Sequence, residues 1–457
     1  MFSTTKTHIK KGQRRMDILG LTTTALGLQD VSIEKVSYDP KTLSATIQVR
    51  QCRESAKCSR CKEPLHGVRQ WRKRTLKGIT LGALTNVKVI FYQLQGGCGR
   101  CVKHRLSHAP FIHPRFKKLT TAFAENAGRL MEEITCEATA RLVHYDSKPL
   151  WSLDQWRMRK MKSIWKPADQ KLRLKHMSAD EVHMRTIKPK KREDRWKREE
   201  WERKFITNLV CYNHSKVIAN AAGRDARSLK KCLMQLSEPQ RLMIEYLAVD
   251  MHDPFIKAAT KLCPNADIAV DRFHLAEAMN RRFDEVRKTE LTKAREAKDI
   301  FQEGMLAPSR RFVLMERNRE LSKSDQKMLD RMREENKNIH NAMLIVEYFH
   351  VLLDKKTVTE FRKSLALWKG LVEDSGLEPL KKFSKLVTKY VAYIETYIKS
   401  HLTTAVSEGL NNKIKVLKRM GYGYTNEESF MNKILQRCGF LNSNHINTNS
   451  WFFEVLA

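Results

Sequence analysis

The stretch Leu247–Asn280 constrains the fold more than any other part of the 457-residue chain. An apolar run ends at Asp250, a helical segment follows as far as Pro264, and a second apolar run ends at Asp271 before a further helical segment. Strands and helices that alternate in this way predict a layered α/β domain with a partly parallel sheet. Such sheets bind ligands at the C-terminal ends of their strands, where both acids stand. Aspartate also favours turns and helix N-caps, so each acid alone has a purely structural explanation.

The charge balance predicts a polyanionic partner. The chain has 86 Lys and Arg against 51 Asp and Glu, a net charge of +35, spread along its whole length. An excess of this size favours an extended surface for DNA or RNA. No apolar run is long enough for a membrane span, and the first twenty residues lack the core of a secretory signal. We therefore expect a cytoplasmic protein without membrane contact, whose ten cysteines do not form a disulfide framework.

Two Cys-x-x-Cys pairs, separated by 36 residues, predict one structural Zn²⁺ site. Four thiolates on two tight turns suit tetrahedral zinc. Leu76–Gln95 has strand character, so a hairpin would fill the gap and complete a zinc ribbon. Two unrelated reduced pairs are the alternative, and Cys52 lies outside the pattern. The expected zinc ligands are Cys58, Cys61, Cys98 and Cys101.

Helical periodicity follows the ribbon. Residues Ile134–Met161 read as a helix, a break at Asp146–Pro149 and a basic second helix. This arrangement is typical of a helix-turn-helix that lays its second helix in the major groove, although an ordinary helical hairpin has the same pattern. In the DNA-binding interpretation, three residues of the second helix contact DNA: Arg157, Arg159 and Lys160.

Three acids far apart in sequence belong to the remaining segments. Asp180 lies in a strand within Leu172–Thr186, Asp250 ends a later strand, and Glu408 opens a basic helix. A carboxylate in the first turn of a helix is also favoured by the helix dipole. The other segments are a dense charge run, read as an exposed basic insertion or helical arm (Lys188–Lys204), a hairpin (Phe205–Arg224) and a helical insertion (Arg281–Lys399).

The order strand, hairpin, helix, strand, helix, strand, insertion, helix predicts an RNase H-like mixed sheet. In that fold the three carboxylates meet at one edge, where they could hold two divalent cations for phosphoryl transfer. The predicted fold is therefore multi-domain α/β. Its domains are an N-terminal segment (1–45), a zinc ribbon (46–112), a helix-turn-helix (113–168), the first part of the catalytic domain (169–284), the helical insertion (285–399) and the last part of the catalytic domain with a C-terminal helix (400–457).

The chain resembles DDE transposases of the bacterial insertion-sequence family called ISL-three. The resemblance lies in the cysteine pairs and the helix-turn-helix, and in the blocks SADEVH, VDMHDPFIKA, AVDRFH and SEGLNNKIKVLKRMGYGYTNEESF. It implies that Asp180, Asp250 and Glu408 are catalytic ligands of two Mg²⁺ or Mn²⁺ ions. Asp271 and His274 resemble a D-x-x-H element of eukaryotic DDE enzymes, which implies a supporting role; a helix cap and a buried histidine are the alternative.

The resemblance implies a function on double-stranded DNA. The ribbon and the helix-turn-helix would bind the terminal inverted repeats of the element. The metal site would then cut the ends and join the freed 3′-hydroxyl to target DNA, within a homodimer or larger synaptic complex at the bacterial nucleoid. An RNase H-like nuclease or resolvase, and a non-catalytic DNA-binding derivative, are the alternatives. Further residues expected to contact DNA are Arg272, His274, Asn412, Lys413, Lys415, Lys418 and Arg419.

Overall fold

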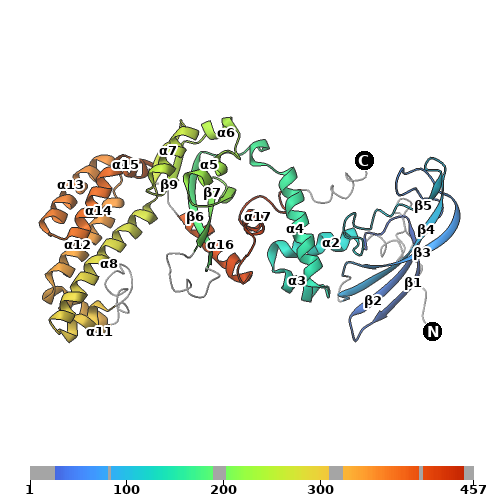
Figure 1. The fold of residues 1–457 in the computed structure, drawn as a ribbon, viewed down its shortest axis with the longest axis horizontal. Helices are drawn as coiled ribbons and strands as arrows, with labels where there is room; N and C mark the ends of the chain where they lie inside the picture. The colour runs from blue at the N-terminus through green and yellow to red at the C-terminus, as the bar shows by residue number, and fades with distance from the viewer. Residues whose placement is uncertain (1–25, 81–83, 189–201, 308–322, 401–404, 447–457) are drawn as a thin grey trace, which may run out of the picture. The chain divides into compact units, whose positions relative to one another are not determined.

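The computed structural model describes residues 26–80, 84–188, 202–307, 323–400 and 405–446. It is a mixed α/β structure with two five-stranded sheets (Figure 1). The chain divides into two compact units: unit 1 comprises Met1–Ile164 and Phe440–Ala457, and unit 2 comprises Trp165–Gly439. Within the described ranges no helix is both long and apolar enough to cross a bilayer.

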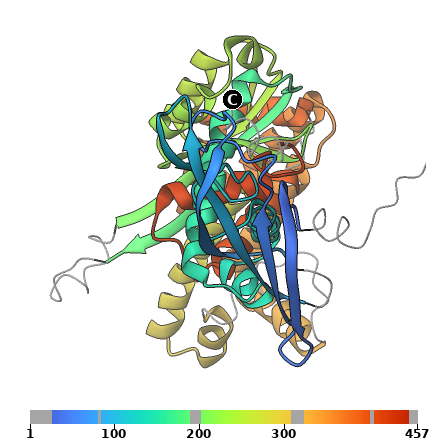
Figure 2. The ribbon, with the colours of Figure 1, turned by 90° about the vertical axis from the view of Figure 1, so that its right-hand side faces the viewer.

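Unit 1 contains a strongly twisted sheet with the order β1-β2-β4-β3, in which β5 also pairs with β4 (Figure 2). Its alternate residues are buried on one face, where Ile47, Val49 and Phe91 belong to one apolar cluster. β1 and β2 form a hairpin, whose turn is held by Asp39 accepting from the N–H of Lys41. The strands are β1 (Val31–Asp39), β2 (Ser44–Gln51), β3 (His66–Lys77), β4 (Asn86–Cys98) and β5 (Lys103–Leu106).

Three helices follow the sheet in unit 1. Each of the first two begins at a threonine cap: Thr120 accepts from the N–H of Phe123, and Thr135 accepts from the N–H of Ala138. The predicted break between the last two helices is confirmed, but it lies earlier, between Leu142 and Ser147. Pro149 stands in the first turn of the last helix, where a backbone N–H has no intrahelical partner, so the proline does not interrupt the helix. The helices are α2 (Thr121–Glu133), α3 (Cys136–Leu142) and α4 (Ser147–Ile164).

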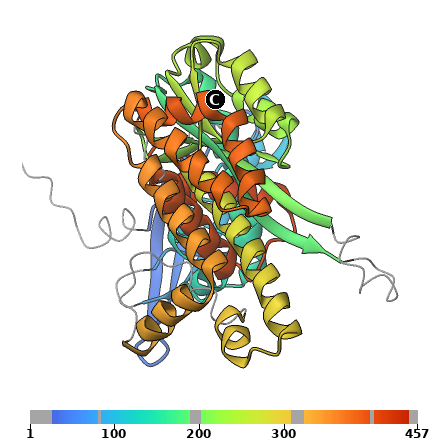
Figure 3. The same cartoon turned by 90° about the vertical axis from the view of Figure 1, so that its left-hand side faces the viewer.

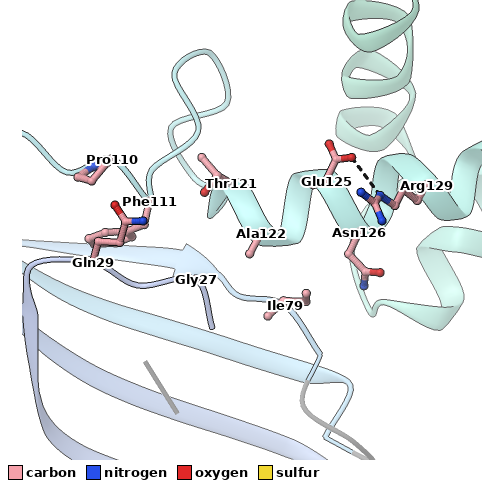
Figure 4. A pocket seen from close by; sticks show the side chains of 10 residues that line it. All are labelled: Gly27, Gln29, Ile79, Pro110, Phe111, Thr121, Ala122, Glu125, Asn126 and Arg129. Carbon is pink, nitrogen blue, oxygen red and sulfur yellow. Dashed lines mark hydrogen bonds and ion pairs between the residues drawn. The ribbon is translucent and has the colours of Figure 1, made fainter. Parts of the chain in front are cut away.

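A cavity of about 610 Å³ lies in unit 1 beside the start of α2 (Figure 4). Figure 4 shows the ion pair between Glu125 and Arg129 at one end of it and Phe111 at the other. None of the predicted site residues lines this cavity.

The sheet of unit 2 has the order β10-β9-β6-β7-β8. β6, β7 and β8 are antiparallel neighbours, whereas β6, β9 and β10 are parallel. The predicted strand–helix–strand–helix order of Leu247–Asn280 is confirmed, and so is the hairpin that turns at Asn213–Lys216. The strands are β6 (His176–Ile187), β7 (Glu202–Cys211), β8 (Lys216–Ala222), β9 (Tyr246–Val249) and β10 (Asp267–Val270).

Short helices cover this sheet. α5 (Ala226–Leu233) packs on β7 and β8, and α7 (Asp253–Leu262) packs on β9 and β10. α16 (Ala405–Met420) packs on β6, and α17 (Glu427–Cys438) packs on β8. α6 (Glu238–Leu242) leads into β9.

Most of unit 2 between β10 and α16 is a helical body, drawn in yellow and orange in Figure 3. Its apolar core contains Phe349, Trp368 and Phe383, and the ring centroid of Phe349 lies 5.1 Å from that of Trp368 and 5.0 Å from that of Phe383. The predicted helical character is confirmed for the described residues. The helices are α8 (Arg272–Glu296), α9 (Ile300–Leu306), α11 (Lys323–Glu335), α12 (Lys337–Leu353), α13 (Val358–Asp374), α14 (Glu378–Lys389) and α15 (Val391–Ser400).

The basic segment Lys188–Lys204 differs in part from its prediction, which placed no strand there. β7 begins at Glu202, so residues 202–204 extend the hairpin with β6. Residues 189–201 lie outside the described residues, and the predicted arm stays a prediction for them.

Candidate active site

The four cysteines of the two pairs converge in unit 1. Their Sγ atoms lie within 4.8 Å of one another, with Cys61 and Cys98 3.3 Å apart, and Cys58 and Cys101 3.9 Å apart. Four sulfurs at tetrahedral Zn–S distances of about 2.3 Å would be roughly 3.8 Å apart, so the cluster fits zinc.

Each pair is built on a tight turn. In the first turn the N–H of Arg60 points to the Sγ of Cys58, and in the second the N–H of Cys101 points to the Sγ of Cys98, both at 3.4 Å. The residue after each pair, Lys62 or Val102, has a positive φ of 64° or 50°, which closes the turn. The local sequence therefore sets most of this geometry.

The pKa values of two of the thiols, Cys58 and Cys98, are shifted in opposite directions. Burial raises the pKa of Cys58, but hydrogen bonds from the N–H groups of Cys61 and Arg60 outweigh burial and lower the pKa to about 7. A backbone N–H lowers the pKa of Cys98, but burial and hydrogen bonds to the other thiols outweigh it and raise the pKa to about 12. Because neighbouring thiolates repel, a cation is needed before all four can be anionic.

Asp180 is the most closely held acid of unit 2. Its Oδ1 accepts from the N–H of Glu181 at 2.7 Å, and its Oδ2 accepts from the side-chain amide of Asn411 on α16. Burial raises the pKa of Asp180, but His274, the N–H of Glu181 and Asn411 together outweigh burial and lower it. Asp180 is therefore a carboxylate at neutral pH.

His274 lies between Asp180 and Asp250. Its Nε2 is 3.4 Å from Oδ1 of Asp180, and its Nδ1 is 3.9 Å from Oδ1 of Asp250, which stands just after β9. Burial lowers the pKa of His274, but Asp180, Asp250 and Asp271 outweigh burial and raise it to about 9. The imidazole is therefore protonated at neutral pH and offsets one of the two negative charges of Asp180 and Asp250.

Two further acids, Glu181 and Asp271, lie near Asp180, Asp250 and His274. Burial, with the charges of Asp180 and Asp250, raises the pKa of Glu181 to about 7. Asp271 is 6% exposed and caps α8 by accepting from the N–H of Phe273 at 2.8 Å, as its structural explanation required. Burial raises the pKa of Asp271 to about 6. Sequence reasoning passed over Glu181 and Asn411, although both adjoin a predicted site residue.

Glu408 reaches this region through α16. Ser407 Oγ lies 2.6 Å from Ser178 Oγ on β6 and 3.1 Å from the hydroxyl of Tyr212. Glu408 is exposed, and it shares a helix face with Asn411, which stands three residues later and contacts Asp180. The structure thus places Asp180 and Asp250 on either side of His274. It also places the first turn of α16 against β6, the strand that carries Asp180. Among the described residues, the four cysteines are the one group of three or more His, Cys, Asp or Glu whose ligand atoms all lie within 4.8 Å of one another. The carboxylate oxygens of Asp180, Asp250 and Glu408 are therefore farther apart than that.

The predicted DNA-contacting residues of unit 2 lie in different settings. Lys418 donates to the carbonyl of His183 at 3.0 Å and so fixes α16 on β6. Arg272 is half-buried and ion-paired with Asp354. His274 lies between Asp180 and Asp250, with its side chain 17% exposed. The remaining four are exposed along α16: Asn412, Lys413, Lys415 and Arg419.

In unit 1, Arg159 is exposed and Lys160 half-buried, but Arg157 contradicts its prediction. Arg157 is 2% exposed, and its guanidinium pairs with Glu132 at 2.9 Å and Glu125 at 3.3 Å. The arginine crosses Gly128 of α2, where a Cβ would lie 2.1 Å from its Nε. Burial of a charge requires partners, and Glu125 and Glu132 of α2 supply them, so Arg157 links α4 to α2 and offers almost no surface to DNA.

Known proteins resemble this chain over most of its length. The model of the DDE transposases of the ISL3 family, described as "Transposase", matches residues 193–434, more than half of the chain. This range contains Asp250, His274 and Glu408, and begins after Asp180. The transposase for insertion sequence element IS1001 of Bordetella parapertussis is 22% identical over 411 residues, which cover 89% of this chain and 95% of that protein.

A solved structure is a more distant neighbour. The Drosophila P element transposase strand transfer complex has 10% identity and a TM-score of 0.33, over 70% of this chain and 92% of that one. A score this low does not relate the two folds. The family match stands without it, and the chain belongs to the ISL3 family of DDE transposases.

Proposed function

We propose that this transposase cuts DNA at the ends of an insertion sequence and joins them to target DNA, using Asp180, Asp250 and Glu408. One observation carries the proposal: Asp180 on β6 and Asp250 after β9 face the same imidazole, while α16 reaches Asp180 through Asn411. The order of three antiparallel strands followed by two parallel ones supports an RNase H-like domain.

The donor set fits divalent cations of the Mg²⁺ type. Mg²⁺ and Mn²⁺ prefer carboxylate oxygens, and Mg²⁺ keeps several waters, so three carboxylates suffice for two ions. When bound, such ions would activate the attacking oxygen and stabilise the leaving one. Asp180 and Asp250 would hold one ion together, and Glu408 would complete the site from α16.

The other residues of the site position these ligands and neutralise charge. Asn411 orients the Asp180 carboxylate by donating to its Oδ2, and Ser407 fixes the first turn of α16 through Ser178. Protonated His274 offsets the charge of Asp180 and Asp250. The exposed cations Lys413, Lys415 and Arg419 would contact phosphates next to the site.

Unit 1 would supply end recognition. Its cysteine cluster fits one structural zinc, and α3 and α4 have the order of a helix-turn-helix. Double-stranded DNA is then the substrate of both units, and synapsis of two ends would need a homodimer or a larger assembly.

Purified protein incubated with duplexes that carry its element ends, with and without Mg²⁺, tests the proposal. We expect Mg²⁺-dependent nicking at the end of the element and, with a target plasmid, joined products. Cutting without joining would favour a nuclease or resolvase. Binding without either reaction would favour a non-catalytic derivative.

A further inference from the structure

One face of the unit 1 sheet is basic and open, and is here called the basic sheet face. Residues opposite one another in a ladder point to the same side of a sheet. In one row of cross-strand pairs, Lys35 of β1 is opposite Gln48 of β2, and Gln48 is opposite Ile90 of β4. In the next row, Tyr92 of β4 is opposite both Arg50 of β2 and Lys73 of β3. The basic sheet face consists of Lys35, Arg50, Trp71, Lys73, Lys88 and Tyr92.

The opposite face of the same strands forms the apolar core. Ile47, Val49 and Phe91, which alternate with residues of the basic sheet face, are at most 1% exposed. Lys35, Lys73 and Lys88 are exposed, and within the described part of the chain none of the three forms an ion pair. Ion pairing within the sheet therefore does not explain why these positions are cationic.

The centre of the basic sheet face is a fixed guanidinium. The carbon at the centre of the Arg50 guanidinium lies 4.8 Å from the ring centroid of Trp71 and 5.3 Å from that of Tyr92. A bulge at Glu34 lets that acid pair with Arg50 and hold it in place. Because the arginine already covers both rings, the rings are not free to stack on unpaired bases, as single-strand binding would require.

The spacing of the cations favours a duplex. β1 and β3 are the edges of the path β1-β2-β4-β3, and Lys35 stands in the row of Gln48, Ile90 and Thr75, two residues along β3 from Lys73. The two lysines are therefore three strand spacings apart across the sheet and two residues apart along it, roughly 16 Å in all. That separation exceeds the width of the major groove, about 12 Å, by a few ångströms that two flexible lysine side chains can span, so the two cations can reach phosphates on both of its sides. The hydroxyl and amide of Thr46 and Gln48 between them are further donors of the kind that bind phosphates.

We propose that the basic sheet face binds the sugar–phosphate backbone of double-stranded DNA. The proposal rests on the DNA-binding part of the proposed function and adds a contact outside the helix-turn-helix. Phosphate contacts carry no base sequence, so this face holds any duplex and fixes the register in which other elements read the ends.

The full chain, with its zinc, tests this by fluorescence anisotropy with 30-base-pair duplexes and the corresponding single strands, without added Mg²⁺ or Mn²⁺, over a series of salt concentrations. The variant is Lys35→Ala/Lys73→Ala/Lys88→Ala. Each lost phosphate contact lowers the slope of log affinity against log salt by about 0.9, so we expect a slope lower by about 2.7, equal on element-end and random duplexes. Lys73→Ala alone should lower it by about 0.9.

The matched control removes three exposed lysines from the helical body: Lys356→Ala/Lys363→Ala/Lys382→Ala. It should keep the wild-type slope, and both triple variants should keep the wild-type zinc content and circular dichroism. A wild-type slope in the sheet variant, or a loss confined to single-stranded probes or to element ends, would overturn the proposal. Mg²⁺-dependent cleavage by the wild type is scored separately, so failure of the catalytic proposal is a different result.

Discussion

The cysteine cluster and the carboxylate site reach their geometry by different routes. The cysteines lie on two turns between positions 58 and 101, and their four Sγ atoms already lie within 4.8 Å of one another. The carboxylates come from β6, from the end of β9 and from α16, with the whole helical body between the second and third. Local turn chemistry builds the first site, whereas sheet order and helix docking build the second. The two sites should therefore respond differently when one residue is removed.

The largest effect is expected from loss of zinc. We expect purified, reduced protein to contain about one zinc per chain, and Cys58→Ser or Cys98→Ser to lose it. Structural zinc contributes on the order of 10 kcal/mol to folding, so the sheet of unit 1 should become sensitive to protease at temperatures where the wild type resists. Elemental analysis and limited proteolysis measure both effects.

Cys52 offers the matched control, because it is half-buried and outside the cluster. Cys52→Ser should keep both the zinc and the protease resistance. Carefully reduced wild-type protein without zinc would contradict the prediction, and so would equal zinc loss in the Cys52 variant.

The next largest effect is expected at the carboxylates. Asp180→Asn, Asp250→Asn or Glu408→Gln keeps the shape but removes an anionic ligand, which is worth several kcal/mol of transition-state stabilisation. Cleavage and joining should both fall by about 10³-fold, because one site serves both reactions. DNA affinity should persist or rise slightly, since repulsion of phosphates is relieved. Rates on labelled element ends and anisotropy measure the two quantities.

Glu181→Gln is the informative comparison at the same strand. The loss of activity in Glu181→Gln is expected to be smaller than in the three variants above. Burial and the neighbouring acids raise the pKa of Glu181 to about 7, so much of this side chain is already neutral near that pH. Full activity in the Glu408→Gln protein would remove Glu408 from the site and leave Asp180 and Asp250 with another partner.

The sequence predicts elements better than side-chain settings. The alternation in Leu247–Asn280 predicts β9, α7, β10 and α8 because strand and helix periods differ and Pro264 separates them. The basic helix predicts that Arg157 contacts DNA, but the partners that bury this arginine, Glu125 and Glu132, lie on another helix. Asn411 carries no signal of its own, since its role exists only once α16 docks on β6.

The pH dependence of stability is the next test of the carboxylate site. The pKa of His274 is raised from 6.5 to about 9. Its contribution is therefore fully present below about pH 6.5 and is lost as the pH rises through about 9. A rise of this size corresponds to on the order of 3 kcal/mol. Denaturant unfolding of the zinc-loaded protein, without added Mg²⁺ or Mn²⁺, should show that loss between pH 6.5 and 9.5.

His274→Asn should flatten this part of the curve, because the asparagine does not titrate. Glu181 and Asp271 also have raised pKa values, of about 7 and 6, so they lower stability as they ionise, mostly below pH 7. The same slope above pH 7.5 in wild type and variant would mean that His274 is not held by the two aspartates.

The smallest effect is expected at Asn411, which acts through Asp180. Its amide donates to Oδ2 of Asp180, so Asn411→Ala frees that carboxylate without removing a ligand. Outer partners of metal ligands are worth about 10–100-fold in metal affinity, so the Mg²⁺ concentration for half-maximal cleavage should rise by about that factor while saturating Mg²⁺ restores the rate. Val416→Ala, 44% exposed on the same helix, should keep the wild-type midpoint. A rate that Mg²⁺ cannot restore, or an unchanged midpoint, would mean that Asn411 only packs α16 against β6.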